Sequence, residues 1–175
     1  MNKIDQKKES FTLRINAESI DLIKENAHKE NVSVNQFINR LLDTAVYWNL
    51  HARSAGWIPM PKQILLELIK KSSDAEIEEL ADKLGKQIAK DILLFTDKKY
   101  DVDSWIDFLR IRSQVSGFEF TEHKEDNIIK CIIHHSMGKK WSIWFQRFYN
   151  NVMTDMNAKV KFEISENIIS MTIQK

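Results

Sequence analysis

Residues 11–46 read FTLRINAESIDLIKENAHKENVSVNQFINRLLDTAV and form the most informative part of the sequence. Phe11, Leu13 and Ile15 alternate with Thr12 and Arg14, and a period of two over five residues predicts a short, half-buried strand. We expect the apolar side chains to face a core. The Thr12 and Arg14 side chains then lie on the opposite, open face of the strand.

Two amphipathic helices are predicted after this strand. Asn16 suits the N-cap of the first helix, which is expected to end near Asn31 because asparagine tolerates a left-handed backbone. Ser33 and Gln36 have the spacing of a capping box at the start of the second helix. Its apolar stripe consists of Val34, Phe37, Ile38, Leu41, Leu42 and Ala45. One strand and two short helices bury little surface alone, so this segment is predicted to need a partner.

A linker and a second domain are predicted beyond residue 50. Residues 51–61 contain Gly56, Pro59 and Pro61, which interrupt helical continuity. In residues 62–175 the apolar period predicts three helices: a short one around 64–69, one capped by Ser73 or Asp74 that runs to Ile92, and one capped by Asp101 or Asp103.

The pattern changes after Gly117 from helical to alternating. Alternation from Phe118, a turn at 124–127 and a strand at 128–135 predict a hairpin. A helix with Trp141, Trp144, Phe145 and Phe148 at helical spacing follows, and this aromatic stripe fits a core better than a ligand pocket. Residues 160–173 predict a second hairpin. The fold class is therefore α+β, with helices on one face of an antiparallel sheet.

The overall composition is that of an ordinary globular protein, with 43% hydrophobic and 29% charged residues. The single Cys131 excludes an intramolecular disulfide. No stretch is apolar enough to span a membrane, and the N-terminal residues MNKIDQKKES lack the apolar region of a signal peptide. We therefore expect a cytoplasmic protein with no membrane partner.

The net charge of the chain gives little indication of a nucleic-acid partner. The net charge is +1, whereas DNA-binding proteins often carry a clear basic excess. Lys3, Lys7, Lys8 and Arg14 nevertheless cluster in the N-terminal arm and predicted strand, while most acidic residues fall on the first helix. The N-terminal arm and the predicted strand are therefore expected to form a local basic edge.

The segment from about residue 10 to 48 resembles the ribbon-helix-helix (MetJ/Arc type) DNA-binding family. FTLRI corresponds to the ribbon, AESIDLIKENAHKEN to the first helix, VSVN to the turn and QFINRLLDTAV to the second helix. The resemblance implies that residues 1–50 are a DNA-binding module. It also implies a homodimer whose paired N-terminal strands enter the major groove, and hence a sequence-specific transcriptional regulator.

The same resemblance implies the residues that contact double-stranded DNA. Ser10, Thr12 and Arg14 would contact base edges, because arginine can bond two acceptors of guanine and threonine can touch a thymine methyl group. The phosphate contacts would come from Lys7, Lys8, Ser33, Val34 and Asn35, the last three at a helix N-terminus that attracts anions. The alternative is that Thr12 and Arg14 are ordinary solvent-facing residues and Ser33 an ordinary cap.

Three interpretations of the whole chain stay open. In the first, residues 62–175 of a regulator bind a small-molecule effector or join dimers into a tetramer. In the second, the chain is an antitoxin-type DNA-binding protein that binds a protein partner, although antitoxins usually append a short segment that folds on the toxin. In the third, Cys131, His134 or His135 serves a small metal-binding enzyme.

The third interpretation is the least favoured. Cys131 and His134 are three positions apart on a predicted strand and therefore point to opposite faces, whereas Cys131 and His135 share an apolar face. The sequence contains no glycine-rich phosphate loop and no recognisable nucleophile motif. We therefore expect no enzymatic activity, no cofactor and no metal.

Overall fold

The computed structural model describes residues 9–10, 12–52, 54–94 and 99–174. The chain divides into two compact units, which we call unit 1 (residues 1–43) and unit 2 (residues 44–175). Each unit is described by itself. None of the helices in the described ranges has the length and apolar character that crossing a membrane requires.

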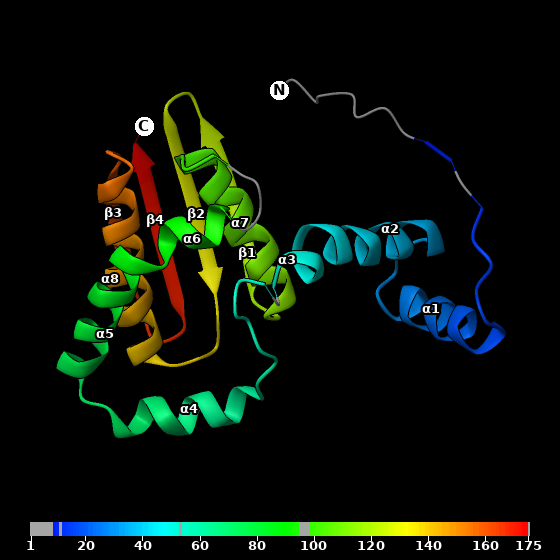
Figure 1. Ribbon diagram of the computed structural model, residues 1–175, viewed down its shortest axis with the longest axis horizontal. Coiled ribbons are helices and arrows are strands. Elements are labelled where there is room, and N and C mark those ends of the chain that lie inside the picture. Colours follow the sequence, from blue (N-terminus) through cyan, green and yellow to red (C-terminus); the bar gives the residue numbers. More distant parts are fainter. Residues whose placement is uncertain (1–8, 11, 53, 95–98, 175) are drawn as a thin grey trace. The chain divides into compact units, whose positions relative to one another are not determined.

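Unit 1 consists of a helix pair, labelled α1 and α2 in Figure 1. Helix α1 spans Ala17–Lys29 and helix α2 spans Val34–Thr44, so that its last residue belongs to unit 2. Asn31 between them has φ 53°, as predicted for the end of the first helix. The predicted capping box is also confirmed, because Gln36 Oε1 accepts the Ser33 amide at 2.9 Å and Ser33 Oγ accepts the Gln36 amide at 3.2 Å.

The strand predicted at 11–15 is not formed by the part of it that the structure describes. Residues 12–15 have no regular structure, and Phe11 lies outside the described residues. Strand geometry depends on hydrogen bonds to a neighbouring strand, and the described part of the chain supplies none there. In the described part of unit 1 the buried side chains are Ala27 and Phe37. Apolar side chains predicted for its core are exposed instead, among them Leu13 (49%) and Leu41 (46%).

Unit 2 begins with helical segments. A π-helix, η1 (Ala45–Asn49), continues from α2 and leads into α3 (Leu50–Ala52). Then follow α4 (Lys62–Lys71), α5 (Asp74–Gln87), α6 (Ala89–Leu94) and α7 (Val102–Val115). Ser73 caps α5 and Asp101 caps α7, as predicted. The single helix predicted from residue 74 to 92 is wrong, because the backbone turns at Ile88 (φ −103°, ψ −11°) and divides it into α5 and α6.

The two predicted hairpins form a four-stranded antiparallel sheet. Its strands are β1 (Glu119–Glu125), β2 (Ile128–His134), β3 (Lys159–Ile164) and β4 (Ile168–Gln174), and α8 (Lys139–Asp155) lies between the hairpins in sequence. The strand order is β1-β2-β4-β3, so each hairpin contributes one central and one edge strand. Strand β2 ends at His134, one residue earlier than predicted.

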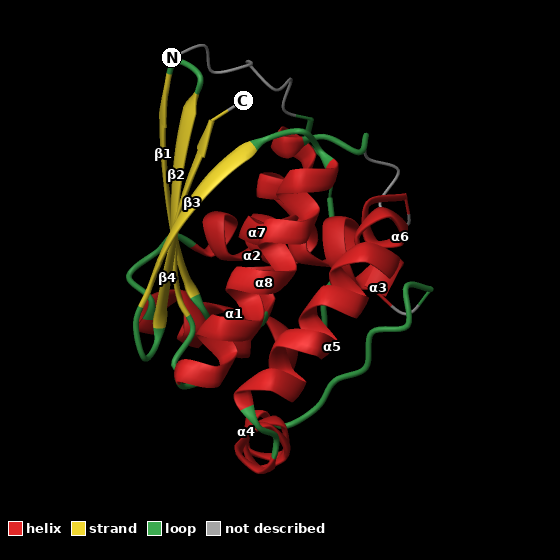
Figure 2. Ribbon diagram, turned by 90° about the vertical axis from the view of Figure 1, so that its left-hand side faces the viewer, coloured by secondary structure: helices red, strands yellow, loops and turns green. Residues whose placement is uncertain are grey.

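The core of unit 2 lies between this sheet and its helices. Figure 2 shows α5, α7 and α8 on one side of the sheet, as predicted. The two central strands direct alternate side chains into this layer, and the register pairs Ile129 with Ile173 and Cys131 with Met171. The aromatic stripe of α8 belongs to the core: Phe145 and Phe148 are buried, and Trp141 and Trp144 are partly buried against them.

Helix α5 packs closely on α8 at Gly85. A Cβ atom there would lie 3.1 Å from the Phe148 carbonyl oxygen and 3.1 Å from Asn151 Cβ. Alanine would gain about 0.5–1 kcal/mol in helix propensity, but overpacking against backbone costs about 1–3 kcal/mol. We expect Gly85→Ala to lower the free energy of unfolding by roughly 1 kcal/mol in urea titrations. Lys83→Ala, at an exposed α5 position, is the control, and a stabilised Gly85→Ala protein would contradict the close packing.

Candidate functional site

The residues predicted to contact bases lie at the surface of unit 1. Ser10, Thr12 and Arg14 are exposed, and the described residues around them form no strand that would place them on a common face. Lys7 and Lys8, predicted to contact phosphate, lie outside the described residues. The structure therefore leaves the predicted base contacts available to a ligand without assembling them into a site.

Three of the residues predicted to contact DNA phosphates lie together at the start of α2. Ser33 precedes the helix, and Val34 and Asn35 are its first residues. The Ser33 hydroxyl and the Gln36 side chain are engaged with each other in the capping box, at 2.9 Å between Oγ and Oε1. The first amides of a helix have no partner within it, so those of Val34 and Asn35 are the donors that an anion would meet.

The cysteine and histidine residues of unit 2 do not converge on a metal-binding arrangement. Cys131 is buried in the core, and burial, together with the Glu122 charge, raises the pKa of its thiol to about 12. His123 and His134 are exposed. The described part of the chain holds no group of three or more His, Cys, Asp or Glu side chains that could bind a metal ion.

His135 and Ser142 form a buried pair whose geometry opposes nucleophilic catalysis. The Met137 amide donates to His135 Nδ1 at 3.0 Å, so the proton of the neutral imidazole is on Nε2. Nε2 therefore donates to Ser142 Oγ, 2.9 Å away. Burial lowers the pKa of His135 to about 4, with smaller contributions from His134 and Lys62. A ring that donates to the hydroxyl cannot accept its proton, so the pair fixes the start of α8 instead.

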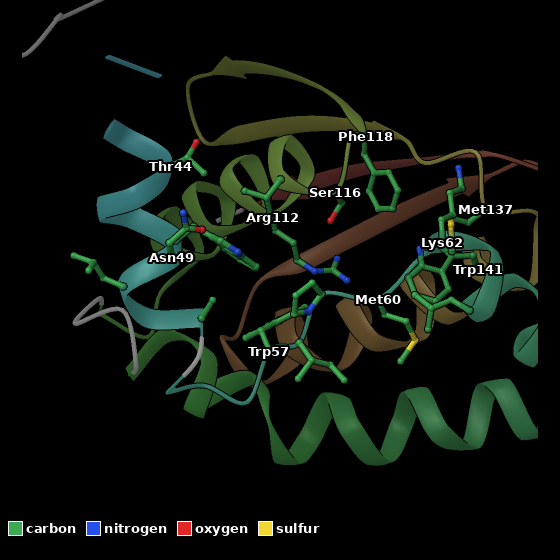
Figure 3. Close-up of a pocket in the computed structure, with 17 residues that line it drawn as sticks. Thr44, Asn49, Trp57, Met60, Lys62, Arg112, Ser116, Phe118, Met137 and Trp141 are labelled. Carbon is green, nitrogen blue, oxygen red and sulfur yellow. The ribbon is translucent and has the colours of Figure 1, made fainter. Parts of the chain in front are cut away.

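Unit 2 contains a cavity of about 1120 Å³ (Figure 3). One wall is formed by described residues between positions 44 and 62, mainly Trp48, Trp57 and Met60. The other wall comes from the end of α7, with Phe118 and Trp141. Trp48 and Trp57 contact each other edge to face, with ring centroids 5.1 Å apart. The lining of the cavity is therefore mostly apolar, and four of its residues are aromatic: Trp48, Trp57, Phe118 and Trp141.

Arg112 is the most distinctive charged group in this cavity. Its guanidinium carbon lies 5.5 Å from the Trp57 ring centroid and 5.2 Å from that of Phe145. One guanidinium nitrogen donates to the Tyr149 hydroxyl at 3.1 Å. Figure 3 shows the side chain extending from α7 among the lining residues. Aromatic rings thus hold the cation in place through their faces.

This cavity was not predicted from the sequence. Residues 51–61 were predicted to be a linker, and Trp57 and Met60 from that segment line the cavity wall. Two tryptophans, Trp48 and Trp57, flank the glycine- and proline-containing stretch and were the available signal. Arg112 carries no signal of its own, because it is one polar residue on an amphipathic helix.

The fold combines a small two-helix unit that leaves apolar side chains exposed with an α+β unit that has its own core. Residues 3–42 match the model of the HicB family. This match overturns our assignment of the segment to the MetJ/Arc type of ribbon-helix-helix family, which is wrong. No curated protein matches the chain.

Proposed function

We propose that this chain is an antitoxin-type protein that binds DNA through unit 1 as a homodimer and also binds a toxin protein. The observation that carries the proposal is the match of residues 3–42 to the HicB family, whose antitoxins pair with HicA toxins. In this proposal the chain acts by binding and has no enzymatic role.

Exposed apolar side chains in unit 1 support the homodimer. Leu13, Ile15, Leu22 and Leu41 are each at least 39% exposed, although their spacing is that of core positions. Pairing of residues 10–15 from two chains would give each segment the hydrogen-bonding neighbour that a strand requires. It would also bring two sets of apolar side chains together and remove them from water, at about 25 cal/mol for each Å² buried.

The paired segment would have a polar face directed toward DNA. Alternation places Ser10, Thr12 and Arg14 on the side opposite Leu13 and Ile15. A two-stranded ribbon fits the major groove, where arginine and threonine can distinguish base pairs. Lys7 and Lys8 from the arm, and the α2 start at Ser33, Val34 and Asn35, would contact phosphates on either side.

Unit 2 would recognise the toxin with a preformed surface. A segment that folds only on its partner has too few apolar residues for its own core. Unit 2 instead buries a continuous cluster that includes Trp105, Phe145 and Tyr149. We therefore expect the toxin to bind a folded unit 2, with little change in helix content on complex formation.

Growth rescue tests the toxin partnership directly. A small HicA-type protein encoded beside this chain is expressed alone and then with the full chain. Growth arrest by the first and recovery with the second are expected, together with co-purification of the two proteins. If neither the neighbouring protein nor a panel of HicA-type toxins is neutralised or co-purified, the antitoxin proposal fails.

Replacing Arg14 by alanine is expected to weaken DNA binding. Loss of a bidentate base contact costs about 1–3 kcal/mol and relaxes sequence preference. Because Arg14 is exposed, the helix content of the protein should not change. Fluorescence anisotropy with a fragment from upstream of the coding sequence, at two salt concentrations, measures the effect. Wild-type binding should weaken steeply with salt.

Lys24→Ala provides the matched control, because it removes one exposed positive charge from α1, where Lys24 pairs with Asp21 at 3.4 Å. We expect its affinity to stay close to that of the wild type. Equal losses in the two variants would show that Arg14 contributes only general charge. Unchanged binding by Arg14→Ala would remove this residue from the DNA-binding surface.

A further inference from the structure

The cavity of unit 2 has the size and apolar character of a small-molecule site. Its volume of about 1120 Å³ lies slightly above the usual range for ligand pockets, so a small molecule would fill part of it. Trp48, Trp57, Phe118 and Trp141 provide flat apolar surfaces on its walls. Such a lining favours a ligand with an aromatic or other flat apolar body over a small inorganic ion.

The charges at the cavity are all of one sign. Arg112 and Lys62 are part of the lining, and none of the described lining residues is Asp or Glu. Lys62 Nζ donates to the His135 carbonyl oxygen at 3.4 Å, which leaves its charge without a counter-charge there. A cavity with two cations and no described carboxylate attracts an anionic ligand.

Arg112 differs from other arginines of unit 2 in its partners. Arg110 pairs with Asp107 and Glu122, and Arg147 pairs with Glu78 and Asp82. For Arg112 the described residues provide aromatic faces and the Tyr149 hydroxyl but no carboxylate. A guanidinium presents five donors in a planar fork, and a single hydroxyl leaves most of them for a carboxylate or sulfonate.

A second, independent observation comes from Trp141. Its indole Nε1 is buried and has no hydrogen-bond partner in the described structure. Buried donors are almost always paired, so such an atom calls for an acceptor. In the view of Figure 3, Trp57 and Trp141 lie on either side of the Arg112 guanidinium. An anionic group in this part of the cavity would meet both kinds of donor.

We propose that the cavity of unit 2 binds a small organic anion, with a carboxylate or sulfonate at Arg112 and a flat apolar body against Trp57 and its aromatic neighbours. The Trp141 indole N–H supplies a further donor to the ligand. The site is formed entirely by residues of unit 2, so the proposal does not depend on DNA or toxin binding.

Isothermal titration calorimetry of the full chain with 2-naphthoate tests the site, and neutral 2-naphthamide is the matched ligand. We expect naphthoate to bind at least 10-fold more tightly than the amide. Arg112→Gln should weaken naphthoate binding at least 10-fold, and Trp141→Phe, which keeps an aromatic ring but removes the N–H, about 3-fold or more. Arg110→Gln removes a neighbouring charge of α7 and should change the affinity less than 2-fold.

Each alternative result has a definite meaning. No naphthoate binding at millimolar concentration, or equal binding of acid and amide, overturns the proposal. Equal losses of affinity in Arg110→Gln and Arg112→Gln would show that the ligand responds only to the general positive charge of the protein. That result also overturns the proposal. Should Arg112→Gln fail to fold, the comparison of acid and amide on the wild-type chain, together with Trp141→Phe, still decides the question.

Discussion

Replacing Trp105 by alanine is expected to lower the free energy of unfolding of unit 2 by about 3–5 kcal/mol, the usual cost of deleting a large core side chain. Trp105 is 0% exposed and is among the largest fully buried side chains. Its ring lies 5.0 Å from Phe108 and 6.2 Å from Phe148, measured between centroids, and so joins α7 to α8. Alanine would leave a cavity that neither helix can close.

Urea unfolding followed by tryptophan fluorescence measures this loss, because all five tryptophans lie in unit 2 and four remain in the variant. Trp105→Phe is the informative comparison. The Trp105 Nε1 is buried without a hydrogen-bond partner in the described structure, so phenylalanine removes an unsatisfied donor while it keeps most of the ring. We expect Trp105→Phe to lose much less stability. If the free energy of unfolding of Trp105→Ala falls by less than about 1 kcal/mol, the Trp105 ring does not fill the core between α7 and α8 as described.

Unit 2 is expected to lose stability between pH 7 and pH 4.5 because of His135. The folded protein holds the pKa of this buried imidazole at about 4, below the ordinary value of 6.5. The unfolded chain therefore binds a proton first as the pH falls. The stabilisation is fully present above pH 6.5 and disappears progressively toward pH 4, which amounts to about 2 kcal/mol by pH 4.5.

Two variants isolate this contribution from the titration of carboxylates. His135→Asn removes the ionisable group while it retains a side-chain oxygen that can accept the Met137 amide, and its stability should vary less with pH. His134→Asn alters the exposed neighbour, whose charge lowers the pKa of His135 less than burial does, and should keep a slope close to that of the wild type. Identical pH slopes in the wild type and His135→Asn would show that the ring titrates normally in the folded protein.

The elements that the sequence predicts well are those determined by local chemistry. Ser33 with Gln36 and Ser73 with Glu76 form capping boxes because the residue types and their spacing are sufficient. The hairpin turns were predictable in the same way: Asp126, with φ 48°, tolerates the backbone that the first turn requires. Alternation of apolar residues then placed both central strands correctly.

The features that sequence patterns miss depend on contacts between distant residues. Ile88 continues the apolar period of α5, so the pattern cannot show that the helix divides there. Strand formation at residues 12–15 requires a neighbour that the described single chain does not provide. The cavity at Arg112 is lined by Trp57 and Trp141, which lie more than 80 positions apart in the sequence. The MetJ/Arc resemblance was wrong for a related reason: a predicted strand followed by two amphipathic helices is too general a pattern to assign a family, and residues 3–42 match the HicB model instead.

The strand order has a consequence for how the protein is made. Strand β4 (Ile168–Gln174) is central in the sheet, and Ile169, Met171 and Ile173 are completely buried. A ribosome that has translated only as far as residue 164 has produced the described helices of unit 2 and strands β1 to β3, but not β4, which pairs with both β2 and β3. The core of unit 2 therefore stays incomplete until β4 is translated. A premature stop codon before Ile168 would yield a fragment that cannot complete the sheet.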